Sequence, residues 1–85
     1  MQMPRTPEEL ENIVAGILES MMMVAPGYVD RDTPVAVYGV DSFARVALVA
    51  EVETQLGLKT QLPEFNDNPT VREIAHRIHE TLNGS

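Results

Sequence analysis

Apolar residues recur at helical spacing in three stretches of the chain, a pattern typical of amphipathic helices. The first stretch begins at Thr6-Pro7-Glu8-Glu9, where a hydroxyl cap, an early proline and a glutamate three residues after the cap favour a helix start. Glu19 falls on another face than the apolar stripe, and we expect a helix over residues 7–24. The stripe consists of Leu10, Ile13, Val14, Ile17, Leu18 and Met21.

A composition typical of turns separates this helix from the next one. Pro26, Gly27, Pro34 and Gly39 interrupt residues 25–41, which predicts a long connecting loop. Loops of this length in a small domain are usually packed by their own side chains or functional. The side chains expected to hold this loop on the helices are Val29, Val35, Val37 and Tyr38.

The second helix, expected over residues 42–56, has two apolar faces rather than one. One face comprises Leu48, Val49, Val52 and Leu56, and the other comprises Phe43, Val46, Ala47 and Ala50. If the first face packs in the core, the second is a candidate docking surface with Glu51 and Glu53 nearby. The alternative is that both faces are buried. Arg45 projects near the core side, where its stem is expected to be buried while its charge stays in water.

Two further elements follow Gly57, which is placed to end the second helix. Residues 62–66 are expected to form one short helical piece, and residues 71–82 a last helix that begins with the capping-box pattern Thr70-Val71-Arg72-Glu73. The stripe of that helix is Val71, Ile74, Ala75, Ile78 and Leu82. Residues 1–85 are therefore expected to form a single all-α domain, a bundle of three main helices and one short helix without strands.

Size, charge and cysteine content exclude several classes of function. Thirteen acidic residues against six basic ones give a net charge of -7, which repels nucleic acid and anionic lipid and favours basic protein partners. A domain of 85 residues has little core in which to build a deep catalytic cleft. The chain has no cysteine, and its start has no basic stretch followed by a long apolar run, so a reducing cytoplasm is expected.

Ser42 is the residue with the most informative position, because it stands at the start of the second helix. Unpaired N–H groups and partial positive charge at such a start favour a phosphate on the hydroxyl. The alternative is that Asp41 or Ser42 only caps the helix. Neither a histidine nor a lysine is close to Ser42 in sequence to serve as its base, so we interpret it as a modified residue rather than a catalyst. His76 and His79 share a face but lack a nearby third metal ligand.

Three motifs in this order and separation resemble the acyl carrier protein family, the phosphopantetheine-binding domains of fatty acid and polyketide synthases. They are Tyr38-Gly39-Val40-Asp41-Ser42-Phe43, the segment from Val52-Glu53 to Leu56-Gly57, and Phe65-Asn66-Asp67-Asn68-Pro69-Thr70-Val71 leading into Ile74-Ala75. The resemblance implies an acyl-carrier-protein-like four-helix bundle that is not itself an enzyme. It further implies that a magnesium-dependent phosphopantetheinyl transferase moves 4'-phosphopantetheine from coenzyme A onto Ser42. Acyl groups then travel as thioesters on the arm to an acyltransferase, a ketosynthase and modifying enzymes, with the carrier as a monomer.

The chain departs from the family pattern beside the serine. Phe43 stands where Leu, Met or Ile is usual, Ala47 replaces a common glutamate, and Arg45 adds a positive charge. We therefore expect partner recognition to be less acidic and more apolar than is usual for the family, with Arg45 favouring a carboxylate on the cargo. The expected partner contacts are Phe43, Val46 and Ala47, supported by Asp41 and Glu51.

Two other interpretations stay open beside an acyl carrier of a polyketide pathway. The first is a peptidyl or aminoacyl carrier, in which histidine or glycine often precedes the serine and the net charge is milder. The second is a small helical interaction module in which Ser42 is only a cap and no prosthetic group is attached. Whether the chain is free-standing or part of a larger synthase is likewise open.

Overall fold

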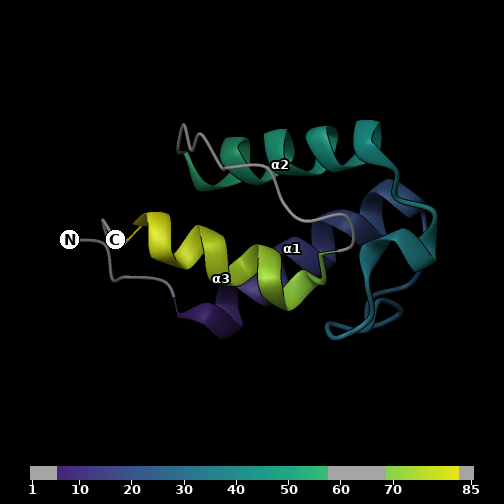
Figure 1. The fold of residues 1–85 in the computed structure, drawn as a ribbon, viewed down its shortest axis with the longest axis horizontal. Coiled ribbons are helices and arrows are strands. Elements are labelled where there is room, and N and C mark those ends of the chain that lie inside the picture. Colours follow the sequence, from purple (N-terminus) through teal and green to yellow (C-terminus); the bar gives the residue numbers. More distant parts are fainter. Residues whose placement is uncertain (1–5, 58–68, 83–85) are drawn as a thin grey trace.

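The computed structural model describes residues 6–57 and 69–82, which form an all-helical arrangement (Figure 1). Helix α1 spans Pro7–Met22, helix α2 spans Ser42–Leu56 and helix α3 spans Val71–Leu82. A short 3-10 helix, η1, at Val35–Tyr38 interrupts the long loop. The short helix expected over residues 62–66 lies outside the described residues.

Helix α1 begins with the capping box that the sequence predicts. The backbone N–H of Glu9 donates to the Thr6 hydroxyl at 3.1 Å, and the backbone N–H of Thr6 donates to the Glu9 carboxylate at 3.3 Å. The helix ends at Met22, two residues before the expected end, because Met23 adopts a left-handed conformation with φ 59°. The N–H of Met23 then pairs with carbonyls of the last turn, which closes the helix.

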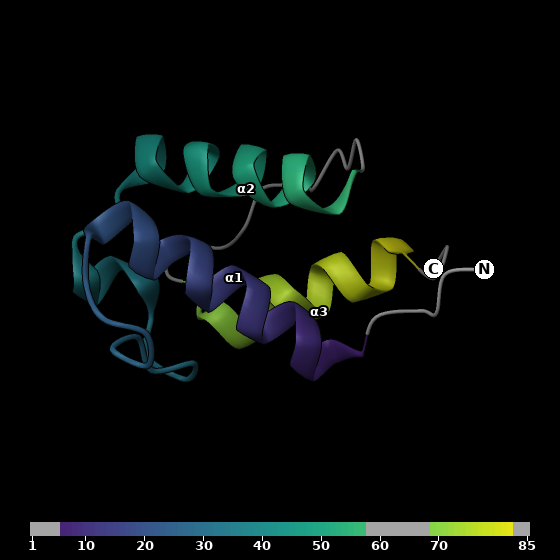
Figure 2. The same cartoon turned by 180° about the vertical axis from the view of Figure 1, so that it is seen from behind.

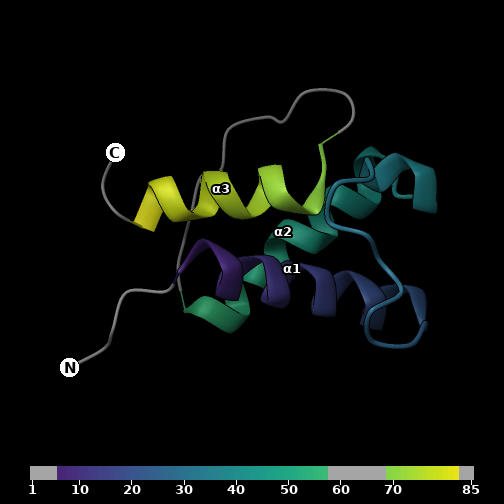
Figure 3. The same ribbon diagram turned by 90° about the horizontal axis from the view of Figure 1, so that it is seen from below.

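Helix α1 is the central element of the bundle. It runs opposite to α2 and to α3, and it packs more extensively on α3 than on α2 (Figure 2 and Figure 3). Side chains from all three helices and from the loop form one apolar core. Its largest fully buried members are Leu10, Leu18, Leu48, Ile74, Ile78, Val14, Val35, Val52 and Val71.

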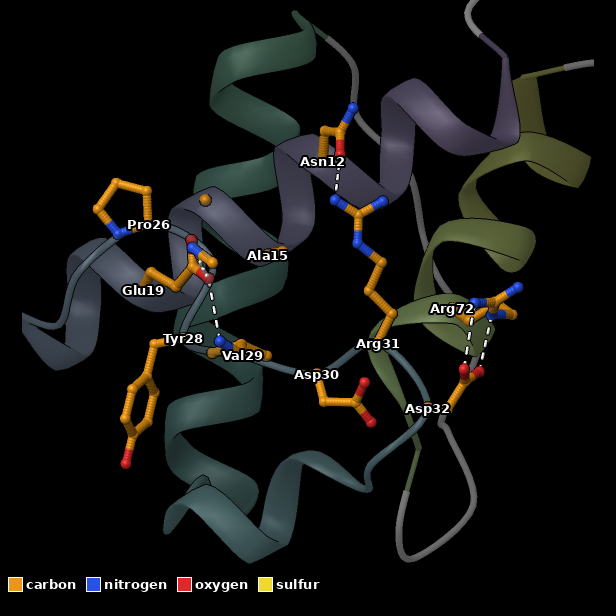
Figure 4. A pocket seen from close by; sticks show the side chains of 12 residues that line it. Asn12, Ala15, Glu19, Pro26, Tyr28, Val29, Asp30, Arg31, Asp32 and Arg72 are labelled. Carbon is orange, nitrogen blue, oxygen red and sulfur yellow. Dashed lines mark hydrogen bonds and ion pairs between the residues drawn. The ribbon is translucent and has the colours of Figure 1, made fainter.

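Glu19 fixes the loop from inside the molecule, which corrects its assignment to a face away from the core. Only 6% of Glu19 is exposed, and one of its carboxylate oxygens accepts hydrogen bonds from the backbone N–H groups of Gly27 at 2.9 Å and Val29 at 3.0 Å (Figure 4). A buried carboxylate is tolerated only where hydrogen bonds replace its hydration. Here the returning loop supplies them.

Val29 and Val35 are buried as expected, and Tyr38 is half-buried. The Tyr38 hydroxyl accepts the backbone N–H of Asp30 at 2.8 Å, so this side chain does hold the loop. The expectation for Val37 is wrong, since 70% of it is exposed. The tight 3-10 turn of η1 buries Val35 but leaves Val37, two residues later, exposed.

A polar hollow of about 520 Å³ lies between α1 and the loop, and charged residues cross it (Figure 4). Arg31 reaches Glu11 at 3.4 Å and also contacts the side-chain oxygen of Asn12, both on α1. Arg72, at the start of α3, forms an ion pair with Asp32 at 2.8 Å. These contacts tie the loop to α1 and α3, and we interpret the hollow as a structural junction.

No helix among residues 6–57 and 69–82 is both long enough and apolar enough to cross a membrane.

Candidate functional site

The first turn of α2 places Ser42 at the surface while Asp41 caps the helix. The Asp41 carboxylate accepts the backbone N–H of Ala44 at 2.8 Å, and its carbonyl accepts the backbone N–H of Arg45 at 2.9 Å. Ser42 is the first residue of the helix and is exposed. Of the two caps that the sequence allows, the structure uses Asp41, so the hydroxyl of Ser42 is not needed for capping.

The chain that leads into this turn is fixed by Gly39 and Val40. Gly39 ends η1 in the left-handed region with φ 84°, a conformation that strains any other side chain. Val40 is buried, and its N–H bonds back to the Val35 carbonyl at 3.4 Å. The buried anchor two residues before Ser42 therefore holds the start of α2 at one end of the bundle, beside η1 and the last turn of α1 (Figure 1).

Arg45 lies one turn along α2 from Ser42, and its guanidinium contacts the serine. The Nη2 atom of Arg45 is 3.5 Å from the Oγ atom of Ser42, a long hydrogen bond in which the guanidinium donates. Arg45 is half-buried, in keeping with a stem that packs against the helix. This contact was not predicted from the sequence, which places Arg45 near the core side, although the i, i+3 spacing is a signal for it.

Helix α2 has one buried and one exposed apolar face, so the alternative that both faces are buried is wrong. Leu48 and Val52 are in the core, whereas Phe43 is 84% exposed and Val46 is 71% exposed. Ala47 is half-buried beside them. Exposed large apolar side chains gathered on one helix face are typical of interaction sites.

Asp41 and Glu51, which are both exposed, supply negative charge near this face. Asp41 immediately precedes Ser42, and the first turn of α2 contains no acidic residue. Asp41 and Arg45 are therefore charges of opposite sign on either side of Ser42 along the chain, a mixed environment for an anion attached to the hydroxyl.

This arrangement suits a covalently modified serine better than a nucleophilic one. In the described part of the chain the Ser42 hydroxyl contacts a guanidinium, which offers N–H donors and no acceptor that could take a proton from it. His76 and His79 are on α3, and His76 lies 3.9 Å from Glu80. Among the described residues, no group of three or more potential ligands is placed to hold a metal ion.

The sequence model of a family described as "Phosphopantetheine attachment site" matches residues 8–78. Among curated proteins, the chain is 35% identical over 65 residues to the non-reducing polyketide synthase ausA of Aspergillus calidoustus, covering 76% of this chain and 3% of that protein. It is 32% identical over 83 residues to the phthioceranic/hydroxyphthioceranic acid synthase of Mycobacterium tuberculosis, covering 95% of this chain and 4% of that protein. The chain thus spans a small fraction of these relatives. No solved structure matches.

Proposed function

Because this chain belongs to the phosphopantetheine-attachment family of acyl carrier domains, whose members hold 4'-phosphopantetheine covalently, we propose that the group is attached to Ser42. The support is the exposed hydroxyl at the first position of α2, together with the use of Asp41 rather than Ser42 as the cap. The fit of the site rests on chemistry as well, since the helix start and Arg45 both favour an anion on that oxygen.

The function that we propose is to carry acyl or polyketide intermediates, and this chain is then a substrate shuttle rather than an enzyme. When bound, the group supplies a thiol that holds the cargo as a thioester. The residues of the chain anchor the arm at Ser42, and this attachment point is exposed to solvent. The free end of the arm can then enter the active sites of other proteins. A polyketide synthase among the relatives supports polyketide chemistry. A peptidyl or aminoacyl carrier is the alternative.

The partners that we propose are a phosphopantetheinyl transferase and, after it, an acyltransferase, a ketosynthase and modifying enzymes of a synthase. The exposed face of α2 next to Ser42 is the surface that we expect them to contact, with Phe43, Val46 and Ala47 as apolar contacts. Asp41 and Glu51 add negative charge that suits partners with basic residues around the entrances to their active sites. Since several partners must use one face in turn, we propose that the carrier acts as a monomer in the cytoplasm, either free-standing or within a longer synthase.

The intact mass of the protein tests this proposal directly. After incubation with coenzyme A, magnesium and a broad-specificity phosphopantetheinyl transferase, we expect a gain of one phosphopantetheine group. Ser42→Ala should abolish the gain. Ser20→Ala is the matched control, because Ser20 is an exposed serine on α1 and should leave loading unchanged.

The opposite result has a clear meaning. If the protein is folded by circular dichroism and gains no mass, Ser42 is not the attachment site, and the helical interaction module becomes the better interpretation. That module would bind its partner equally well as Ser42→Ala and would keep its function, whereas a carrier loses its function with the attachment oxygen.

A further inference from the structure

The guanidinium of Arg45 lies beside the Ser42 oxygen to which a phosphate would be attached. Its Nη2 atom is 3.5 Å from the Ser42 Oγ, the oxygen that becomes the ester oxygen in the proposed modification. The non-bridging oxygens of the phosphate would be two bonds beyond this oxygen, close enough for the same guanidinium to reach them. We propose that Arg45 binds the phosphodiester of the phosphopantetheine arm, an inference that rests on the proposed attachment to Ser42.

The negative charges around Ser42 explain why a phosphodiester there would need a positive partner. The chain carries a net charge of -7, and the exposed carboxylate of Asp41 immediately precedes the serine, so an added phosphodiester is repelled by its surroundings. The partial positive charge of the helix start offsets part of this repulsion, although Asp41 already takes the N–H of Ala44. Arg45 contributes a full positive charge to the same turn.

The geometry of Arg45 favours the phosphate over a carboxylate on the cargo. The cargo is carried at the far end of the arm, whereas Arg45 contacts the oxygen at its root. A guanidinium presents two parallel N–H groups that match two phosphate oxygens, which lysine cannot do. Arg45 is also half-buried, so part of the side-chain entropy is already lost before the phosphate arrives.

A consequence is that the loaded form should be stabilised relative to the unloaded form through Arg45. The melting temperature should be measured for both forms of the wild type, Arg45→Gln and Arg45→Lys. Arg77→Gln on α3 is the matched control, because it removes the same charge from an exposed position on another helix. Each loaded sample is first verified by intact mass. This check separates the failure of attachment from the failure of the arginine contact.

We expect loading to raise the melting temperature of the wild type more than that of Arg45→Gln. The difference between the two increments should be about 2–4 °C in 50 mM salt, the size expected for one favourable exposed charge pair in a domain of this size. Arg45→Lys should keep part of the increment, and Arg77→Gln should keep all of it. In the wild type, the increment should shrink toward that of Arg45→Gln at 1 M salt. The phosphodiester ³¹P resonance should also differ between wild type and Arg45→Gln.

The outcomes distinguish a failure of the proposed attachment to Ser42 from a failure of the proposed contact with Arg45. A wild type that gains no mass overturns the attachment to Ser42, and the inference about Arg45 with it. A wild type that is loaded, with an increment equal to that of Arg45→Gln and insensitive to salt, overturns the role of Arg45 alone. Should Arg45→Gln fail to fold, Arg45→Lys and the salt series on the wild type still decide the question.

Discussion

Asp41 and Ser42 are neighbours in sequence but differ in their roles at the start of α2. The side chain of Asp41 points back to the N–H of Ala44, a bond that stabilises the helix. The hydroxyl of Ser42 is left exposed at the first helical position. A serine that also had to cap would lose that bond on esterification. Because Asp41 caps the helix, the proposed modification of Ser42 would leave the cap of α2 in place.

Glu19 is a buried polar residue whose removal should destabilise the fold. In Glu19→Ala the backbone N–H groups of Gly27 and Val29 lose their acceptor, and we expect a loss of roughly 2–3 kcal/mol in the free energy of unfolding. Urea denaturation followed by circular dichroism measures it. Glu19→Gln keeps an acceptor oxygen and should lose less, while Glu8→Gln, at an exposed position, should change little. Equal stability of Glu19→Ala and Glu8→Gln would contradict this account of the loop.

At the scale of single elements, the sequence predicts what depends on neighbours along the chain. The capping boxes at Thr6 and Thr70 need partners only three residues away, and both are present. The two apolar faces of α2 follow from helical spacing in the same way. Which of them is exposed depends on where α1 lies, and this is not encoded in the spacing of α2 itself.

The features that the sequence analysis missed depend on where the chain returns. Glu19 is buried because the loop brings two N–H groups to it from eight and ten residues further along the chain. The contact of Arg31 with the side chain of Asn12 likewise forms because the loop returns to α1. The contact of Arg45 with Ser42 is local, but a helical wheel gives only the direction of the side chain and not its reach. Local pattern thus predicted helices α1, α2 and α3, whereas tertiary contacts decided the burial of Glu19 and the partner of Arg31.

The exposed face of α2 should affect transfer and not stability. Phe43→Ala and Val46→Ala remove exposed side chains, so we expect the free energy of unfolding to change by less than about 0.5 kcal/mol. Loading by the transferase should nevertheless fall several-fold in kcat/KM, because the apolar contact is lost. Leu48→Ala on the buried face is the contrasting variant, with an expected loss of about 2–5 kcal/mol. If charge reversal in Glu51→Lys disrupts transfer far more than Phe43→Ala does, the apolar face is not the main contact.

At the scale of the whole molecule, the three helices are not held equally. Helix α1 contributes Leu10, Val14, Ile17 and Leu18 to the core and packs extensively on α3. Helix α2 has only Leu48 and Val52 among its buried residues. Since stability within a domain follows the local density of buried contacts, α2 is the helix that should open at the lowest free energy. Among the described residues, the helix that carries Ser42 is thus also the least firmly packed of the three.

Amide hydrogen exchange tests this order of stability. We expect the amides of α2 to exchange through local opening faster than those of α1 and α3, which should exchange only near the free energy of global unfolding. Leu10→Ala, which weakens the shared core, should speed exchange in all three helices, whereas Val52→Ala should act first on α2. A helix that opens separately can adjust its angle to α1 when a partner binds its exposed face, while the rest of the bundle stays intact. Equal protection of α1 and α2 in the wild type would mean that partners meet a rigid α2.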